Sequence, residues 1–183
     1  MNTCVITGAS TGLGLSLAQR FSENHHIINY DILEGQDLNL AHVRDSVCVS
    51  CQSARVFINN CQIHQLELLE RVYSQAEPIL IINISASAPT LWTAPWPSWQ
   101  DYISRKQALD QRVRELQSSD HFADEERRNW IMNVRPGFMN TDQHRSRGYR
   151  TMDTGSVAQL IWDLAGGWPQ YAVLDIMVVP SSV

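Results

Sequence analysis

Short apolar runs alternate along the whole chain with segments in which apolar residues recur every three or four positions. The apolar runs predict strands at Cys4–Thr7, Ile27–Tyr30, Val56–Asn59, Ile79–Ile84, Trp130–Val134 and Leu174–Val179, with one more short strand at Asp37–Leu40. The longer segments predict helices over Leu13–Glu23, Ala41–Cys51, Gln65–Gln75, Trp99–Gln117 and Thr154–Leu164. Strands that alternate with helices predict an α/β fold, in which a doubly wound parallel β-sheet has helices on both faces.

The bulk properties are those of one globular domain that spans residues 1–183, with 44% hydrophobic and 18% charged residues. The net charge of −5 argues against a nucleic-acid or anionic membrane partner. No apolar run reaches the length of a membrane span, and no secretory segment precedes the first strand. Four cysteines (Cys4, Cys48, Cys51 and Cys61) are too few for a disulfide framework, so we expect a cytoplasmic protein. Cys48-x-x-Cys51 lacks a second pair at zinc spacing, so no metal site is expected.

A glycine-rich turn over Thr7–Gly14 joins the first strand to the first helix. Glycines let the backbone approach a pyrophosphate, and the free N–H groups of a helix start point at it. The alternative is an ordinary strand–helix connection. Asp31 ends the second strand, where a carboxylate can hold both ribose hydroxyls of an adenosine and would repel a 2′-phosphate. We therefore predict a Rossmann-type dinucleotide site that prefers NAD(H) to NADP(H). The contacts expected from the turn are Gly8, Ser10, Thr11, Gly12, Leu13 and Gly14.

Tyr102 and Lys106 lie four residues apart in the predicted helix Trp99–Gln117, so they share one face. A phenol has an ordinary pKa of about 10, and a nearby ammonium favours the phenolate and lowers that pKa. Such a pair is a general acid–base suited to the interconversion of a carbonyl and an alcohol. The alternative is a tyrosine packed on the core beside a solvated lysine. Ser85 and Ser87 end the preceding strand and could steady a substrate oxygen.

Five motifs, taken in order, resemble those of the short-chain dehydrogenase/reductase family, and the resemblance covers nearly the whole chain. The turn Thr7–Gly14 is similar to the family's T-G-x-x-x-G-x-G, and Asp37-Leu38 to its adenine-contacting pair. Asn59-Asn60-Cys61 resembles the N-N-A-G strand end. Tyr102-x-x-x-Lys106 resembles the catalytic pair, and Pro136-Gly137-x-x-x-Thr141 the loop that packs on the nicotinamide.

The resemblance implies an NAD(H)-dependent oxidoreductase that acts on a small-molecule alcohol or ketone. It implies that Tyr102 exchanges a proton with the substrate oxygen, while Lys106 binds the nicotinamide ribose and lowers the pKa of the tyrosine. One serine, Ser85 or Ser87, would hydrogen-bond the same oxygen. Thr11 stands where NADP-preferring relatives often carry a basic residue. The further cofactor contacts that the resemblance implies are Asp37, Leu38, Asn59, Asn60, Cys61, Pro136, Gly137, Phe138 and Thr141. The alternative function is a dinucleotide-binding sensor or scaffold without turnover.

The sequence departs from the family pattern in three places. Ala86 stands where the family has its catalytic serine, and the chain must turn after this strand, so we expect only one neighbouring serine near Tyr102. The segment 61–79 is short, so the family's fourth catalytic residue, an asparagine, has no counterpart. Gln62, His64 or Gln65 could substitute for it, although we interpret all three as solvated loop residues. The segment after Thr141, a lid in relatives, is also short, which leaves the site open or completed by another subunit. Three tryptophans either wall a substrate pocket or fill the space of the missing helix: Trp92, Trp96 and Trp99.

The helices Gln65–Gln75 and Trp99–Gln117 are the pair that relatives pack against a symmetry mate. The second helix carries more apolar residues than one sheet face needs. They are Ile103, Leu109, Val113 and Leu116. We therefore expect a homodimer, or a homotetramer built from it.

Overall fold

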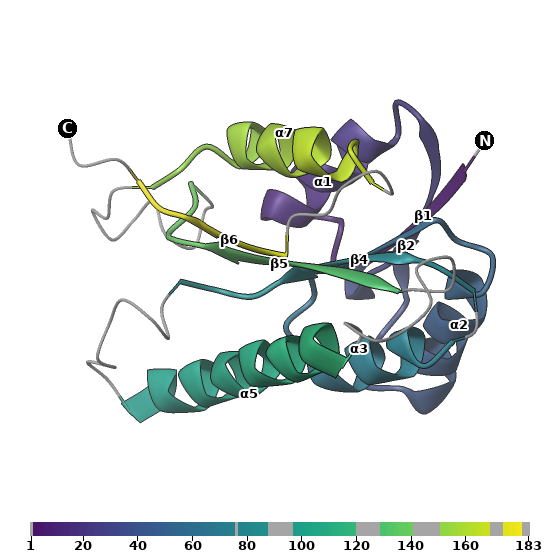
Figure 1. Ribbon diagram of the computed structural model, residues 1–183, viewed down its shortest axis with the longest axis horizontal. Helices are drawn as coiled ribbons and strands as arrows, with labels where there is room; N and C mark the ends of the chain where they lie inside the picture. The colour runs from purple at the N-terminus through teal and green to yellow at the C-terminus, as the bar shows by residue number, and fades with distance from the viewer. Residues whose placement is uncertain are drawn as a thin grey trace.

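Six parallel strands form one sheet in the computed structural model, which describes residues 2–75, 77–87, 97–119, 129–140, 151–168 and 174–180 (Figure 1). Their order across the sheet is β2-β1-β3-β4-β5-β6. The strands are β1 (Asn2–Thr7), β2 (His25–Tyr30), β3 (Val56–Asn59), β4 (Leu80–Ile84), β5 (Trp130–Pro136) and β6 (Asp175–Val178). Each neighbouring pair is parallel, so the predicted doubly wound parallel sheet is confirmed.

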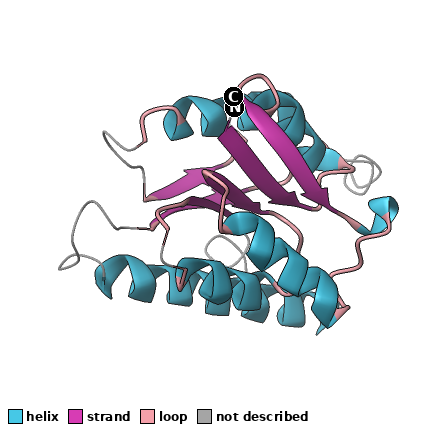
Figure 2. Cartoon of the chain, turned by 90° about the vertical axis from the view of Figure 1, so that its right-hand side faces the viewer, coloured by secondary structure: helices cyan, strands magenta, loops and turns pink. Residues whose placement is uncertain are grey.

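Helices cover both faces of this sheet (Figures 1 and 2). The helices are α1 (Gly12–Phe21), α2 (Ala41–Cys51), α3 (Gln65–Tyr73), α5 (Pro97–Ser119) and α7 (Thr154–Ala165), with a single 3₁₀ turn, η1, at Ile32–Glu34. Helices α1 and α7 pack together on one face, and α2, α3 and α5 lie on the other. The predicted helices all form, and their observed ends differ from the predicted ones by at most two residues.

Two apolar cores result from the alternation of side chains along the buried strands. In β1, Ile6 points toward α1 and α7, whereas Val5 points toward α2, α3 and α5. Helix α1 buries Leu13, Leu17 and Phe21, which recur every four residues and therefore form one stripe. The near-continuous apolar runs of the sequence are thus strands that are buried on both faces.

The chain reverses its direction of travel across the sheet at β1. Strand β2 lies on one side of β1 and β3 lies on the other, so the loops that leave β1 and β3 diverge at the carboxyl end of the sheet. In open α/β sheets, ligands bind in the crevice at this switch point. The predicted short strand at 37–40 is wrong, because these residues form a turn in which Asp37 Oδ1 accepts from the backbone N–H of Asn39 at 2.9 Å.

The apolar residues of α5 do not lie on an outer face. Ile103, Leu109, Val113 and Leu116 are all buried, at 8% exposed or less, while Gln107 on the same helix is exposed. The four residues fill the core between helix and sheet, so they supply no subunit interface. Self-association stays a prediction, but the apolar residues of α5 no longer support it. None of the described helices is both long and apolar enough to cross a membrane.

Candidate active site

The glycine turn that follows β1 is closed tightly on itself. Gly8 and Gly12 have φ angles of 73° and 57°, which side chains rarely adopt. A Cβ added at Gly14 would lie 1.9 Å from the carbonyl oxygen of Gly8, so only glycine fits there. The side chain of Thr11, which precedes α1, makes no capping hydrogen bond, and the buried Ser10 hydroxyl has no partner among the described residues. The first N–H groups of α1 and this hydroxyl are therefore suited to bind an anion.

Side chains at the end of β2 hold the turn in place. Asn29 Oδ1 accepts from the N–H of Ala9 at 3.2 Å, and Asp31 Oδ2 accepts from the N–H of Ser10 at 3.1 Å. The other carboxylate oxygen of Asp31 accepts from the N–H of Leu33 at 2.9 Å. A carboxylate oxygen has two lone pairs, so each can still accept from one more donor. Asp31 thus stands against the glycine turn, as the sequence predicts.

The end of β3 is fixed to the same turn from the other side. Asn60 Nδ2 donates to the carbonyl of Gly8 at 2.8 Å. Thr7 Oγ1 accepts from the N–H groups of Asn60 and Cys61, each at 3.1 Å. The predicted contacts from β1, β2 and β3 therefore converge on one turn at the carboxyl end of the sheet.

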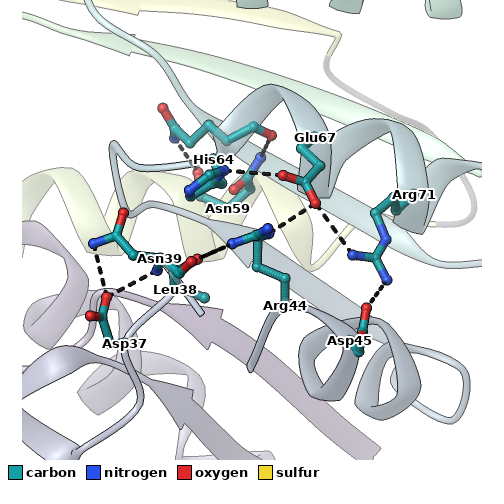
Figure 3. Close-up of polar contacts among 10 residues, drawn as sticks. Asp37, Leu38, Asn39, Arg44, Asp45, Asn59, His64, Glu67 and Arg71 are labelled. Carbon is teal, nitrogen blue, oxygen red and sulfur yellow. Dashed lines mark hydrogen bonds and ion pairs between the residues drawn. The ribbon is translucent and has the colours of Figure 1, made fainter. Parts of the chain in front are cut away.

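An arginine holds the loop that carries Asp37 and Leu38 (Figure 3). Arg44 Nη1 donates to the carbonyls of Leu38 and Asn39 at 2.7 and 3.0 Å, and its Nε donates to Glu67 at 2.9 Å. The loop is thereby linked to α3. Leu38 itself is buried in the core, so its side chain cannot contact a ligand. The side chain of Leu13 is buried as well. Asn59 is also buried, and its Oδ1 has no hydrogen-bond partner among the described residues.

Lys106 is the only lysine in the sequence, and it is 4% exposed. Its ammonium donates to Gln65 Oε1 at 2.6 Å and to the carbonyl of Ile84 at 2.9 Å. Burial lowers the pKa of Lys106 to about 8, although the charge of Asp110 acts in the opposite direction. The alternative of a solvated lysine is therefore wrong.

Tyr102 lies one turn before Lys106, with its ring centroid 5.8 Å from the ammonium nitrogen. Burial and the charge of Asp110 raise the pKa of Tyr102 to about 12. Arg105 acts in the opposite direction, but burial of the phenol dominates. Tyr102 is therefore protonated at neutral pH and can donate a proton. The role of Lys106 in lowering the pKa of Tyr102 stays a prediction.

Gln65 is buried at 5% exposure, so its interpretation as a solvated loop residue is wrong. His64 adopts a left-handed backbone conformation with φ of 56°, and α3 begins at the next residue, which turns inward. Gln62 is exposed and His64 is partly exposed. The sequence carried a signal for this burial: Gln65 shares the spacing of Leu68, Leu69 and Val72, which form the buried stripe of α3.

A row of asparagines crosses the sheet beneath this site. Asn59 Nδ2 donates to Asn83 Oδ1 at 3.2 Å, and Asn83 Nδ2 donates to Asn133 Oδ1 at 2.8 Å. Asn133 Nδ2 in turn donates to Asp110 Oδ1 on α5 at 3.0 Å. A carboxylate only accepts, so Asp110 fixes the orientation of every amide in the row. Sequence analysis missed Asn83, Asn133 and Asp110, which could be found only from the register of three strands.

Ser85 and Ser87 both lie next to β5. The N–H of Ser85 donates to the carbonyl of Val134 at 2.8 Å, and the N–H of Ser87 donates to that of Pro136 at 2.9 Å. Strand β4 ends at Ile84 and the chain bends at Ser87, although the backbone of both serines still pairs with β5. That only one of the two serines lies near Tyr102 stays a prediction. Both hydroxyls are buried and have no hydrogen-bond partner among the described residues. Two donors of this kind are therefore available at the carboxyl end of β4.

Trp99 joins the loop after β5 to the helix of Tyr102. Its ring centroid lies 6.3 Å from that of Tyr102 and 6.2 Å from that of Phe138, with both pairs tilted by 69°. Trp99 therefore packs between Tyr102 and Phe138, and the two interpretations of the tryptophans stay open. Trp92, Trp96 and the predicted contact Thr141 lie outside the described residues. Pro136 and Gly137 lie at the end of β5, and the N–H of Gly137 donates to Val178 O at 2.7 Å.

Comparison with known proteins identifies the fold. No protein-family model and no curated protein matches the sequence. A short-chain dehydrogenase from Streptomyces avermitilis is 15% identical, with a TM-score of 0.75 over 99% of this chain and 89% of that one. A 3-ketoacyl-(acyl-carrier-protein) reductase from Brucella melitensis, in complex with NADH, is 12% identical, with a TM-score of 0.77 over 97% and 96%. An alcohol dehydrogenase from Thermococcus sibiricus, in complex with 5-hydroxy-NADP, is 15% identical, with a TM-score of 0.74 over 97% and 96%.

The sheet order and the glycine turn define an α/β fold of the Rossmann type. More particularly, the chain has the fold of the short-chain dehydrogenases/reductases, as the resemblance of its motifs predicts.

Proposed function

We propose that this protein is an NAD(H)-dependent oxidoreductase that interconverts an alcohol and a carbonyl on a small molecule. The observation that carries the proposal is the burial of the only lysine, Lys106, one helical turn from Tyr102 at the carboxyl end of the sheet. A charged group is costly to bury, and perturbed groups of this kind gather at functional sites.

The glycine turn fits a dinucleotide. Its backbone permits close approach, the Ser10 hydroxyl is buried without a described partner, and the start of α1 has no side-chain cap from Thr11. Residues 8–14 would hold the pyrophosphate, Asp31 the adenosine ribose, and Lys106 the nicotinamide ribose. When bound, the nicotinamide would supply or accept the hydride that the reaction needs.

Tyr102, Ser85 and Ser87 supply the proton and the hydrogen bonds. With a pKa of about 12, Tyr102 carries its proton at neutral pH and is a donor to the oxygen of a carbonyl substrate. The serine hydroxyls are buried without described partners, so one of them can donate to the same oxygen. In alcohol oxidation the same groups act in reverse, and Tyr102 must first lose its proton.

The preference for NAD(H) rests on the charges around the adenosine. Asp31 is acidic, and its neighbours Ser10, Ile32 and Leu33 are uncharged. Arg44, which contacts the nearby loop, is already bonded to Glu67 and to two carbonyls. A 2′-phosphate would thus lie beside the Asp31 carboxylate, and the described residues around it offer no unpaired cationic side chain to balance its charge. Neighbouring structures contain either NADH or NADP, so the fold allows both cofactors.

The test is a cofactor-reduction assay. The purified protein is incubated with NAD⁺ and, separately, NADP⁺ and a panel of small alcohols, and the reverse reaction is run with NADH and the matching ketones. We expect turnover with at least one pair and a preference for NAD(H). NADH binding without turnover on any substrate would instead support a sensor or scaffold. Absence of binding to either cofactor would overturn the proposal.

A further inference from the structure

The buried amide of Gln65 lies between Lys106 and the ends of two strands. Its oxygen accepts from Lys106 Nζ at 2.6 Å. Its nitrogen donates to the carbonyls of Asn59 and Ile84 at 2.7 and 2.9 Å. The carbonyl of Ile84 also accepts from Lys106 at 2.9 Å, so Gln65 and Lys106 share one acceptor at the end of β4.

This arrangement permits only one orientation of the Gln65 amide. If the amide were reversed, its NH₂ group would face the ammonium and its oxygen would face two carbonyls. Asn59 secures the residue further, because its Nδ2 donates to the Gln65 backbone carbonyl at 2.8 Å. Asn59 is held in turn by the row of asparagines that ends on Asp110. Gln65 is thus fixed by its backbone and its side chain together.

We propose that Gln65 is a positioning residue for Lys106, which it holds through a direct, uncharged hydrogen bond. The inference rests on the role of Lys106 in the proposed function. Because the acceptor is an amide and not a carboxylate, Lys106 is oriented without a neutralising partner at its ammonium. Lys106 is therefore held in a fixed position, while its pKa of about 8 lies close to neutral pH.

Few charged groups compete with this interaction. Those that act on Lys106 are Arg105 and Asp110 from α5 and Cys61 from the end of β3, and the ring of Tyr102 lies beside it. Asp110 is bonded to Asn133, one helical turn beyond Lys106. Removal of the Gln65 oxygen would therefore withdraw one of the two acceptors, Gln65 Oε1 and the carbonyl of Ile84, that the ammonium has among the described residues.

The single lysine makes the test direct. Protein labelled with ¹³C-lysine, and free of any tag that contains lysine, gives one side-chain signal set, which can be titrated with pH by NMR. Gln65→Met removes the acceptor that favours the ammonium, so the pKa of Lys106 should fall by about one unit. Gln65→Glu places a carboxylate at the same reach, so the pKa should rise by about one unit or more. Gln62→Met, on an exposed glutamine three residues away, is the control and should leave the titration unchanged.

Opposite shifts for Met and Glu support the proposal whether or not turnover is found, so this test is separate from that of the proposed function. If an active pair of substrate and cofactor is known, turnover can also be measured against pH. The pH at which turnover changes on the alkaline side should then fall for Gln65→Met and rise for Gln65→Glu. Equal titration curves for wild type and both variants would overturn the proposal. Failure of both variants to fold, while Gln62→Met folds, would also overturn it, because Gln65 would then serve the fold and not the lysine.

Discussion

The adenosine side of the site and its catalytic side are built in different ways. On the adenosine side, the turn over residues 8–10 is fixed by Asn29 and Asp31, about 20 positions along the chain, and by Asn60 from the end of β3, and these contacts are partly buried. On the catalytic side, Lys106 is buried and depends on Gln65, which lies 41 residues away. The first is therefore centred on one short turn that the ends of β2 and β3 support, whereas the second exists only once three strands and two helices are assembled.

This difference has a physical consequence for mutation. A substitution on the adenosine side changes a partly buried contact and should alter the affinity for cofactor without much effect on the fold. A substitution on the catalytic side removes a partner from a buried polar group, which costs about 1–3 kcal/mol when the group is left unsatisfied. Variants on the two sides should therefore differ in whether they change cofactor affinity or the buried polar contacts.

The largest effect is expected from Tyr102→Phe. The variant keeps the ring that packs against Trp99 but loses the proton donor, so turnover should fall by about a thousandfold or more while NADH binding changes little. Tyr73→Phe is the control, because the Tyr73 hydroxyl donates to the carbonyl of Leu116, away from the site. Steady-state kinetics and fluorescence titration check both variants. Full activity of Tyr102→Phe would refute the assigned mechanism.

Asp31→Ala tests the adenosine side. Loss of the carboxylate removes both the ribose acceptor and the repulsion of a 2′-phosphate, so NADH should bind about tenfold more weakly and the preference over NADPH should narrow. Fluorescence titration of both reduced cofactors measures the two affinities. Asp163→Ala is the matched control, since Asp163 is an exposed residue of α7 that accepts from Gln159 and is not a predicted cofactor contact. Tighter binding of NADPH than NADH by the wild type would contradict the assignment.

The two serines test the catalytic side more finely. Both hydroxyls are buried without described partners, but only one is expected to donate to the substrate oxygen. Alanine at that position should lower turnover by about tenfold or more, and alanine at the other should have a much smaller effect. Single and double alanine variants, compared by kcat, decide which of Ser85 and Ser87 has this role. Two equally mild effects would show that neither serine acts.

A separate effect is expected on stability as a function of pH, and it concerns the fold rather than turnover or cofactor binding. The pKa of Lys106 is about 8 in the folded protein, and an unfolded chain has a lysine pKa of about 10.4. Between these pH values the unfolded chain binds the proton and the folded protein does not, so stability rises with pH. Below about pH 8 both states are charged, and the full cost of burial is present. Wild type should thus gain roughly 2–3 kcal/mol relative to Lys106→Met from pH 8 to 10.5, measured by urea unfolding. If the free energies of unfolding of wild type and Lys106→Met changed in parallel with pH, the lowered pKa of Lys106 would be contradicted.

Most of the fold and the adenosine side could be predicted from the sequence. The strands alternate with amphipathic helices, and the glycine turn is one short segment whose residues can be recognised in the sequence. The same periodicity, applied with more care, places Gln65 on the buried face of α3. The excess of apolar residues predicted for α5 was wrong, because the four residues that suggested it are all buried within the protein.

The catalytic side could be predicted only in part. Tyr102 and Lys106 share a helix face, so their proximity follows from their spacing. The raised pKa of Tyr102 does not, because burial depends on what packs around the phenol. The row from Asn59 to Asp110 depends on strand register, which sets which asparagines lie opposite one another. Such contacts between distant residues carry no local signature.

The central claim, that the only lysine serves a nicotinamide dinucleotide site, is tested most directly by adding cofactor to ¹³C-lysine-labelled protein at pH 7. The account predicts that NADH shifts the single Lys106 side-chain signal in a saturable way and that NADPH at the same concentration shifts it less. Lys106→Met, which loses the signal, confirms the assignment. A Lys106 signal that stays unchanged at millimolar NADH would contradict the account.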